Sequence, residues 1–236
     1  MIKKYISPDV ETTLSQNMKY DEAHFPLLCK IAERKTEDQI INLFINLEDF
    51  FQQDIIAFKN KNNLKFCVIT LCALLNNNFK EKMLNEVFES DFEMQAFENI
   101  CSEFNLGPNK DTVKSKIKEQ LENLQDTYVA KTENGYHFIH TKEYQIAVSV
   151  CGNILLHNFI KFVRSSFIAE CFCFQSSMED SKKHLIIIDD ENVVKRYFDQ
   201  LLFDLKKGDT YSTFHNFVVN HIRKKSYFTV KSGNKK

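Results

Sequence analysis

Apolar side chains recur at three- and four-residue steps along most of the chain between Asp38 and Val163. The first stripe consists of Ile40, Phe44, Leu47, Phe51 and Ile55. The run Leu64–Leu75 that follows is apolar on nearly every side. Stripes at this spacing indicate amphipathic helices, and a helix that is apolar all round lies inside a core. The pattern therefore predicts one or two amphipathic helices ending near Lys59, followed by a central core helix.

Three more helical stretches are expected before residue 125. Asn76-Asn77-Asn78 should end the core helix, and a short helix is expected over 81–88. The next two stripes are Phe92, Ala96, Phe97, Ile100, Cys101 and Phe104, and then Val113, Ile117, Leu121 and Leu124. Gly107-Pro108 is typical of a helix ending, and Asp111 or Thr112 can cap the helix that follows. We therefore predict two amphipathic helices with a break between them.

The hydrophobic period changes after this point. Two aromatic-rich runs, Tyr128–Lys131 and Tyr136–His140, flank the pair Asn134-Gly135, which is a strong signal for a tight β-hairpin. Another helix is expected from Thr141 toward Val163. Several helices followed by a two-stranded hairpin is the layout of a winged helix. The predicted fold is therefore mainly α, a helical bundle with a winged-helix unit whose single β-hairpin is the wing, followed by a second small helical unit.

That second unit is expected after about residue 165. Its last helix should be capped by Asp189 or Asp190 and end at Lys206-Lys207-Gly208. The stripe of this helix is Val194, Phe198, Leu201, Leu202 and Leu205. The expected organisation is an N-terminal segment over 1–37, a helical winged-helix domain over 38–164, a C-terminal helical segment over 165–224 and a basic disordered tail over 225–236.

Composition narrows the class of protein. Only 5 Gly and 3 Pro occur in 236 residues, which disfavours a fold of many short strands. Lys and Arg number 31 against 32 Asp and Glu, so net charge does not favour coating nucleic acid or an anionic membrane. The 7 Cys are irregularly spaced, and no apolar run approaches the length of about 20 residues that spans a bilayer. A reduced, cytoplasmic chain with no membrane partner is expected.

The sequence offers weak signals for chemistry. Leu185–Ile188 followed by Asp189-Asp190 has the shape of a Walker B strand, but the sequence contains no Gly-x-x-x-x-Gly-Lys-Ser/Thr loop to hold phosphates. We interpret it as a short strand followed by an acidic helix cap. Cys171 and Cys173 have no second pair at zinc spacing, so core thiols are expected and no metal site is predicted. No catalytic residue is predicted, and the chain is not expected to be an enzyme.

Four segments carry a resemblance to a known family. They are Phe25–Cys29, the stretch Leu121–Val129 with Asn134–Lys142, then Ser166-Phe167-Ile168, and Lys207–Asn216. In this order they resemble the winged-helix and following helical segments of the novel STAND NTPases (signal transduction ATPases with numerous domains). The P-loop core of that family has no counterpart here.

The resemblance implies a non-catalytic regulatory and interaction module that senses nucleotide state and assembly, in innate-immune or cell-death type signalling. Residues 1–37 would be a remnant of the ATPase lid. His140 takes the place of the family's wing histidine, which would bond the β-phosphate of ADP. Thr141 replaces the usual Asp, and its hydroxyl could cap the next helix, while Pro26 takes the place of an adenine contact. A Pro that opens a helix is the preferred interpretation of Pro26. No cofactor is expected on this chain alone. ADP or ATP would bind with an upstream ATPase core, and C-terminal repeat domains are further expected partners.

A nucleic-acid-binding winged helix is the alternative. In that case Lys110, Lys114, Lys116 and Lys118 would contact phosphates. The hairpin tip carries Glu133 and no basic residue, and Glu119 and Glu122 dilute the charge of the helix. A solvated helix face is therefore preferred, and nucleic acid is disfavoured as a partner. An enzyme with an unrecognised site is a third, minor hypothesis.

Overall fold

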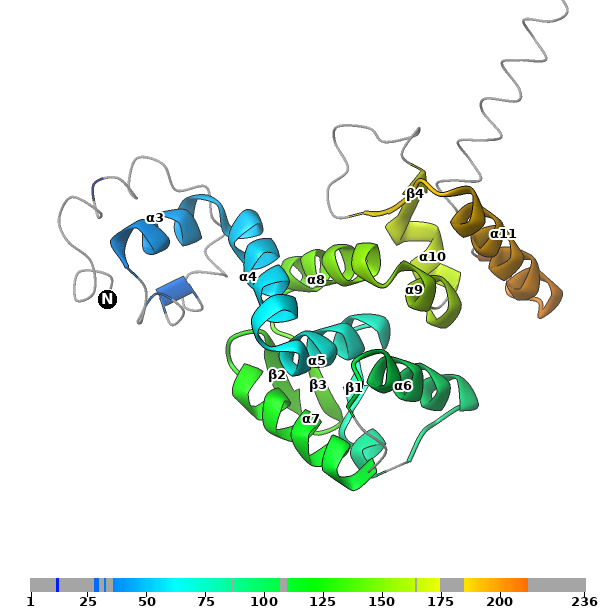
Figure 1. The fold of residues 1–236 in the computed structure, drawn as a ribbon, viewed down its shortest axis with the longest axis horizontal. Helices are drawn as coiled ribbons and strands as arrows, with labels where there is room; N and C mark the ends of the chain where they lie inside the picture. The colour runs from blue at the N-terminus through cyan, green and yellow to red at the C-terminus, as the bar shows by residue number, and fades with distance from the viewer. Residues whose placement is uncertain are drawn as a thin grey trace, which may run out of the picture.

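The computed structural model describes residues 36–85, 87–106, 110–163, 165–174 and 185–211, together with Thr12, Leu28, Cys29 and Ala32. Side chains at 110, 165 and 166 are not described. The elements are α3 (Glu37–Ile45), α4 (Leu47–Lys61), α5 (Asn63–Leu74), β1 (Phe79–Lys80), the 3-10 helix η3 (Glu81–Asn85), α6 (Asp91–Glu103), α7 (Lys110–Leu124), β2 (Val129–Thr132), β3 (Gly135–Phe138), α8 (Thr141–Ile154), α9 (Leu156–Phe162), α10 (Ser165–Cys171), β4 (Phe172–Phe174), β5 (Ile186–Ile188) and α11 (Glu191–Lys206). The fold is mainly helical, as predicted (Figure 1).

The first stripe forms two helices that meet at Asn46. Thr36 and Gln39 make a capping box at the start of α3. The apolar face of α3 packs in a small cluster with Leu28 and Ala32, to which Leu47 and Phe50 of α4 also contribute. The helix α4 therefore leads from this N-terminal cluster into the body of the protein (Figure 1).

The predicted core helix is α5, and it is buried from Phe66 to Leu74. Asn76 and Asn77 follow it with positive φ angles of 57° and 59°, a conformation that Asn tolerates better than most residues and that ends the helix. Because α5 is apolar on all sides, α4, α6, α7 and α8 all pack against it. The prediction of a central core helix is confirmed.

A three-stranded antiparallel sheet, in the order β1-β3-β2, covers this helical core. The predicted hairpin is confirmed, but its turn residues are Glu133 and Asn134, and Gly135 already pairs with Thr132. Gly135 has a φ of 150°, and a Cβ there would lie 2.2 Å from the backbone oxygen of Phe79. The glycine therefore lets β1 approach β3 closely. The strand β1 was not predicted, and the helix expected over 81–88 is the shorter η3.

Two other helix boundaries differ from the prediction. The helix α7 begins at Lys110, so Asp111 and Thr112 lie in its first turn and neither is its N-cap. The helix α6 ends at Glu103, and Asn105 with a φ of 51° follows, while Gly107 and Pro108 lie outside the described residues. Local composition did not fix these ends because several nearby residues suit a cap or a stop.

The helix expected from Thr141 to Val163 breaks at Leu155 into α8 and α9. Beyond it, β4 and β5 form a parallel pair that lies against α8. Asn153 accepts a hydrogen bond from Ile187 N at 2.9 Å and donates one to Leu185 O at 3.1 Å. A Cβ on Gly152 would lie 2.3 Å from the Ile186 side chain, so the glycine permits this close packing. The C-terminal elements thus join the main hydrophobic cluster.

The strand and cap predicted around Asp190 are confirmed. The carboxylate of Asp190 accepts hydrogen bonds from Asn192 N and Val193 N, and Gly208 with a φ of 87° follows the end of α11. The predicted stripe of α11 was partly wrong, because Leu202 and Leu205 are 54% and 41% exposed. The buried residues are Val193, Tyr197 and Leu201. The segment 225–236 and most of 1–37 lie outside the described residues.

Candidate functional site

His140 lies between the hairpin and α8, where it is the N-cap residue of the helix. Its backbone is extended, its side chain is half-buried, and that side chain makes no cap hydrogen bond. Thr141 is exposed and is already the first residue of α8, so the prediction that its hydroxyl caps the helix was wrong. Pro26 lies outside the described residues. Of the three residues proposed to sense nucleotide, the structure describes His140 and Thr141.

In the first turn of α8, the carboxyl group of Glu143 is buried with only 1% of the residue exposed. Neither of its oxygens has a hydrogen-bond partner of ordinary geometry among the described residues. Burial raises the pKa of this carboxyl to about 8, an effect that the backbone of His140 offsets in part. A carboxyl in this environment is protonated at neutral pH.

A second carboxyl group, that of Asp54, lies near Tyr128, as Glu143 does. The hydroxyl of Tyr128 donates a hydrogen bond to Asp54 Oδ2 of α4 at 2.5 Å, and the rings of Phe51 and Phe58 pack against Tyr128. Burial raises the pKa of Tyr128 well above its ordinary value, and the charges of Asp54 and then Glu143 raise it further. Both acids therefore lie near the phenol. We call Asp54, Tyr128 and Glu143 the acid–tyrosine cluster.

The acid–tyrosine cluster lies where α4 packs on α8. At the surface of the same contact, Lys142 of α8 forms an ion pair with Glu48 of α4. Opposite charges thus hold the outer edge of this contact, while the inner part contains a neutral carboxyl and a tyrosine bonded to an acid. This arrangement holds α4 to α8.

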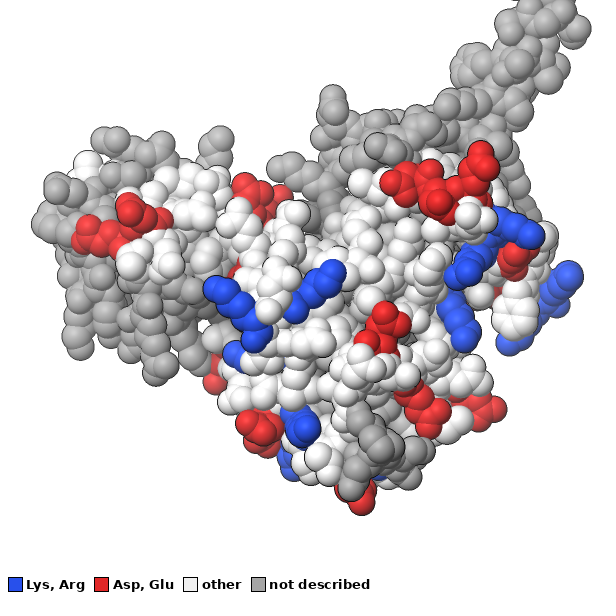
Figure 2. Space-filling view, in the orientation of Figure 1, with Lys and Arg blue, Asp and Glu red and all other residues white. Residues whose placement is uncertain are grey.

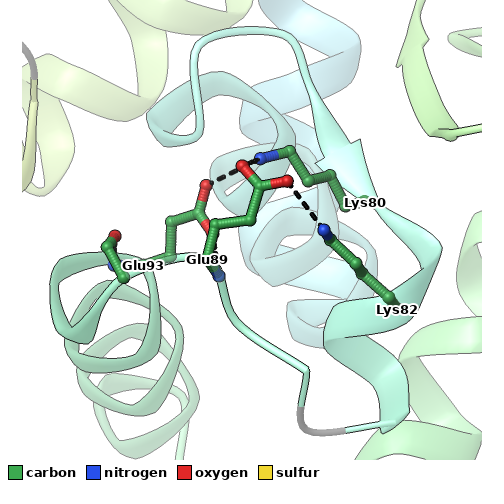
Figure 3. Close-up of polar contacts among 5 residues, drawn as sticks. Lys80, Lys82, Glu89 and Glu93 are labelled. Atoms are coloured by element: carbon green, nitrogen blue, oxygen red, sulfur yellow. Dashed lines mark hydrogen bonds and ion pairs between the residues drawn. The ribbon is translucent and has the colours of Figure 1, made fainter.

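A second polar site lies beside the hairpin. It is a hollow of about 590 Å³ lined by Asn78, Lys80, Glu81, Lys82, Glu89, Glu133 and Asn134. Lys80 contacts both Glu89 and Glu93, and Lys82 bonds Glu89 at 2.7 Å (Figure 3). Hydrogen bonds from Lys80 and Lys82 lower the pKa of Glu89 to about 2. Because these lysines are already paired with carboxylates, the hollow is poorly suited to an anionic ligand.

The lysines of the nucleic-acid alternative lie on α7, whose predicted apolar face is buried at Val113, Ile117, Leu121 and Leu124. Lys116 and Lys118 are exposed and Lys114 is half-buried, while the side chain of Lys110 is not described. Glu119 and Glu122 are exposed on the same helix. Lys114, Lys116 and Lys118 are not among the described residues that line the hollow. On the face shown in Figure 2, positive and negative side chains lie in small interspersed groups.

The thiols belong to the core or its edge, as the sequence suggested. Burial raises the pKa of Cys72, Cys151 and Cys171 to about 12, which disfavours the reactive thiolate. Cys173 is fully buried. Among the described residues, no group of three or more His, Cys, Asp or Glu side chains is placed to hold a metal ion.

The acid–tyrosine cluster was missed at the sequence level. A signal for Glu143 does exist, because it falls on the apolar stripe of Ile139, Ile146 and Val150. An acid on an apolar stripe is either buried with the stripe, or the helix turns a different face toward the core. For Tyr128 and Asp54, 74 residues separate the partners, and local spacing cannot reveal such a contact.

Comparisons with protein-family models, with curated proteins and with solved structures found no match. No helix in the described part of the chain is long and apolar enough to cross a membrane. Functional inference must therefore start from the contacts and charges of this chain.

Proposed function

We propose that the chain is a non-catalytic winged-helix interaction module, corresponding to the part of a STAND-type signalling NTPase that follows the ATPase core. The observation that carries the proposal is the order α5, β1, α6, α7, β2, β3, with β1 and β2 paired on either side of β3. In a winged helix the first strand pairs with the last strand of the wing in this way. On this basis α7 is the recognition helix and the hairpin is the wing.

The position of His140 supports the nucleotide-sensing part of the proposal. It follows the wing directly and begins α8, a helix of 14 residues whose N-terminal end favours an anion such as a phosphate. Glu143 lies in the first turn, but its raised pKa keeps it neutral near pH 7, so it does not repel a phosphate. His140 is half-buried at this junction, which suits a contact completed by a neighbouring domain.

The mechanism would be a shift between two arrangements of the full protein. ADP bound by an upstream ATPase core would contact His140 and favour a closed arrangement. Loss of that contact would release the winged helix and expose surfaces for assembly. This chain would supply the sensor and its partner surfaces, and the core would supply the phosphate-binding loop. Neither ADP nor ATP would bind to the chain alone.

The experiment that tests this function measures ADP binding to the purified chain, alone and with a STAND ATPase core added in trans. We expect binding only with the core, and we expect His140→Ala to weaken it about tenfold or more, the typical cost of losing a hydrogen bond to a charged group. His157→Ala is the matched control, because His157 is exposed on α9. Absence of ADP binding in the mixture, or equal effects of the two substitutions, would contradict the sensor role.

A nucleic-acid-binding winged helix remains the second candidate, because Lys116 and Lys118 are exposed on the recognition helix. The exposed acids Glu119, Glu122 and Glu133 oppose it by repelling phosphates. Fluorescence anisotropy with a labelled DNA duplex distinguishes the two. A dissociation constant below about 1 µM that weakens steeply with salt, and that Lys116→Ala also weakens, would favour nucleic acid.

A further inference from the structure

The helix α4 connects two hydrophobic clusters. Its first turn contributes Leu47 and Phe50 to the N-terminal cluster with α3. Further along, Phe51 and Ile55 are fully buried in the main core. Figure 1 shows α4 running from α3 to the body. Because α4 packs on both α5 and α8, loosening its contact with α8 would weaken the attachment of α3 to the body.

The contact between α4 and α8 contains a carboxyl group, that of Glu143, whose burial is not offset by hydrogen bonds of ordinary geometry from the described part of the chain. Glu143 is 1% exposed, and neither carboxyl oxygen has a hydrogen-bond partner of ordinary geometry among the described residues. An ionised carboxylate without hydrogen bonds is strongly unfavourable at such a site, whereas a protonated carboxyl is tolerated. The packed arrangement therefore favours the proton on Glu143.

The neighbouring groups cannot easily neutralise a charge on Glu143. From α4, Asp54 already accepts the hydrogen bond of Tyr128. Lys142, the residue next to Glu143, is paired with Glu48 of α4 at the surface. From the end of the hairpin, His140 places its backbone near the carboxyl. Ionised Glu143 would thus lie near a phenol whose proton is already donated to Asp54.

We propose that the acid–tyrosine cluster is a proton-dependent latch between α4 and α8. With the Glu143 carboxyl protonated, α4 packs against α8 and Tyr128. When the O–H bond breaks and the proton passes to water or a buffer base, the carboxylate must reach solvent, and α4 moves away from α8. This opening exposes Phe51 and Ile55 and weakens the attachment of α3 to the body. The latch operates whether or not the chain senses nucleotide.

The sign of the pH dependence follows from the pKa of Glu143, which is about 8 when packed against an ordinary value of 4.5. Packing is fully favoured below pH 4.5 and loses that advantage as the pH rises to 8. The opening constant of α4 should rise by up to about tenfold per pH unit in this window and level off above it. Glu143→Gln removes the titrating group and should make the opening constant independent of pH.

Hydrogen exchange measured by mass spectrometry tests the latch, with rates divided by the intrinsic exchange rate at each pH. For the wild type, the opening constant of α4 is expected to rise about tenfold or more between pH 6 and pH 8. In Glu143→Gln it should change by less than about twofold. The helix α11 is the internal reference, and its opening constant should stay well below that of α4 at every pH in both proteins. A flat profile for α4 in the wild type, or opening constants of α4 and α11 that are equal at pH 8, would overturn the proposal.

A matched control is Glu133→Gln, because Glu133 is an exposed carboxyl at the hairpin turn. This variant should show the same pH dependence of α4 as the wild type. If Glu143→Gln does not fold, hydrogen exchange of α4 in the wild type, measured between pH 5 and pH 9, still tests the latch. A rise in α4 opening that levels off near pH 8 supports the latch, and a rise that continues unchanged to pH 9 contradicts it.

Discussion

Glu143 and Glu89 are carboxyl groups of the same chain whose pKa values are displaced in opposite directions. Glu89 is exposed beside the hairpin, where Lys80 and Lys82 donate hydrogen bonds to it and lower its pKa to about 2. Glu143 is buried between α4 and α8, and burial without an adequate donor raises its pKa to about 8. Pairing favours the charge and burial favours the proton. The surface beside the hairpin is thus stabilised by an ionised carboxylate, whereas the contact between α4 and α8 is stabilised by a carboxyl that stays neutral.

The largest expected effect concerns the pH dependence of stability. In the wild type, Glu143 should lower the free energy of unfolding by about 1.4 kcal/mol per pH unit between pH 4.5 and 8, since the unfolded chain releases its proton first. From pH 5 to pH 7 the loss is about 3 kcal/mol. Urea denaturation followed by circular dichroism, compared between the wild type and Glu143→Gln, isolates this contribution. Parallel stability profiles for the two proteins would show that Glu143 is ionised normally.

A smaller effect is expected from the hydroxyl of Tyr128. Tyr128→Phe removes the donor to Asp54 and should cost about 1 to 2 kcal/mol, because it leaves a half-buried carboxylate without this bond. Thermal unfolding measures the change. Tyr211→Phe is the control, since the hydroxyl of Tyr211 bonds Glu170 at an exposed position. An equally small effect of both substitutions would place Asp54 in solvent.

Beside the hairpin, Lys80→Met tests the ion pairs that Lys80 forms with Glu89 and Glu93. Removal of the ammonium group should cost about 1 kcal/mol, since Glu93 loses a partner at 3.1 Å while it keeps the backbone N–H of Glu89. The stabilisation that Glu89 provides above pH 4.5, and loses as the pH falls toward 2, should also shrink. Denaturation at pH 3 and pH 7 measures both changes. If 1 M salt does not change the free energy of unfolding of the wild type at pH 7, these ion pairs contribute little to stability at that pH.

The smallest effect should follow from Glu133→Gln at the hairpin turn. Glu133 is exposed, so its substitution should change the free energy of unfolding by less than about 0.5 kcal/mol. A larger change, measured by the same urea denaturation, would indicate that the hollow beside the hairpin makes contacts beyond the ion pairs around Glu89.

Features set by neighbouring residues could be predicted from the sequence. The core helix α5, the hairpin and the Asp190 cap all follow from apolar runs, turn residues and caps within a few positions of one another. The strand β1 could not be predicted, because its two residues become a strand only when Gly135 lets them approach β3. Leu202 and Leu205 fit a helical stripe, but the packing of Tyr197 turns that face of α11 toward solvent.

In the candidate site too, some residues could be located from local sequence signals, and others became visible only with the fold. His140 could be located between the hairpin and the next helix, because both elements have local signals. The cap role given to Thr141 failed, because the helix begins one residue earlier than a Thr cap requires. The acid–tyrosine cluster depends on three segments that are distant in sequence, so its unpaired carboxyl became visible only with the fold.

The most direct test of the account is an NMR titration of the glutamate side-chain carboxyl carbons in the intact chain, with Glu143 and Glu89 assigned by substitution to Gln. We expect Glu143 to titrate with a pKa near 8 and Glu89 with a pKa near 2 in the same sample. If Glu143 instead titrates near its ordinary value of 4.5 while the protein remains folded, the carboxyl is not held neutral between α4 and α8, and the latch does not exist.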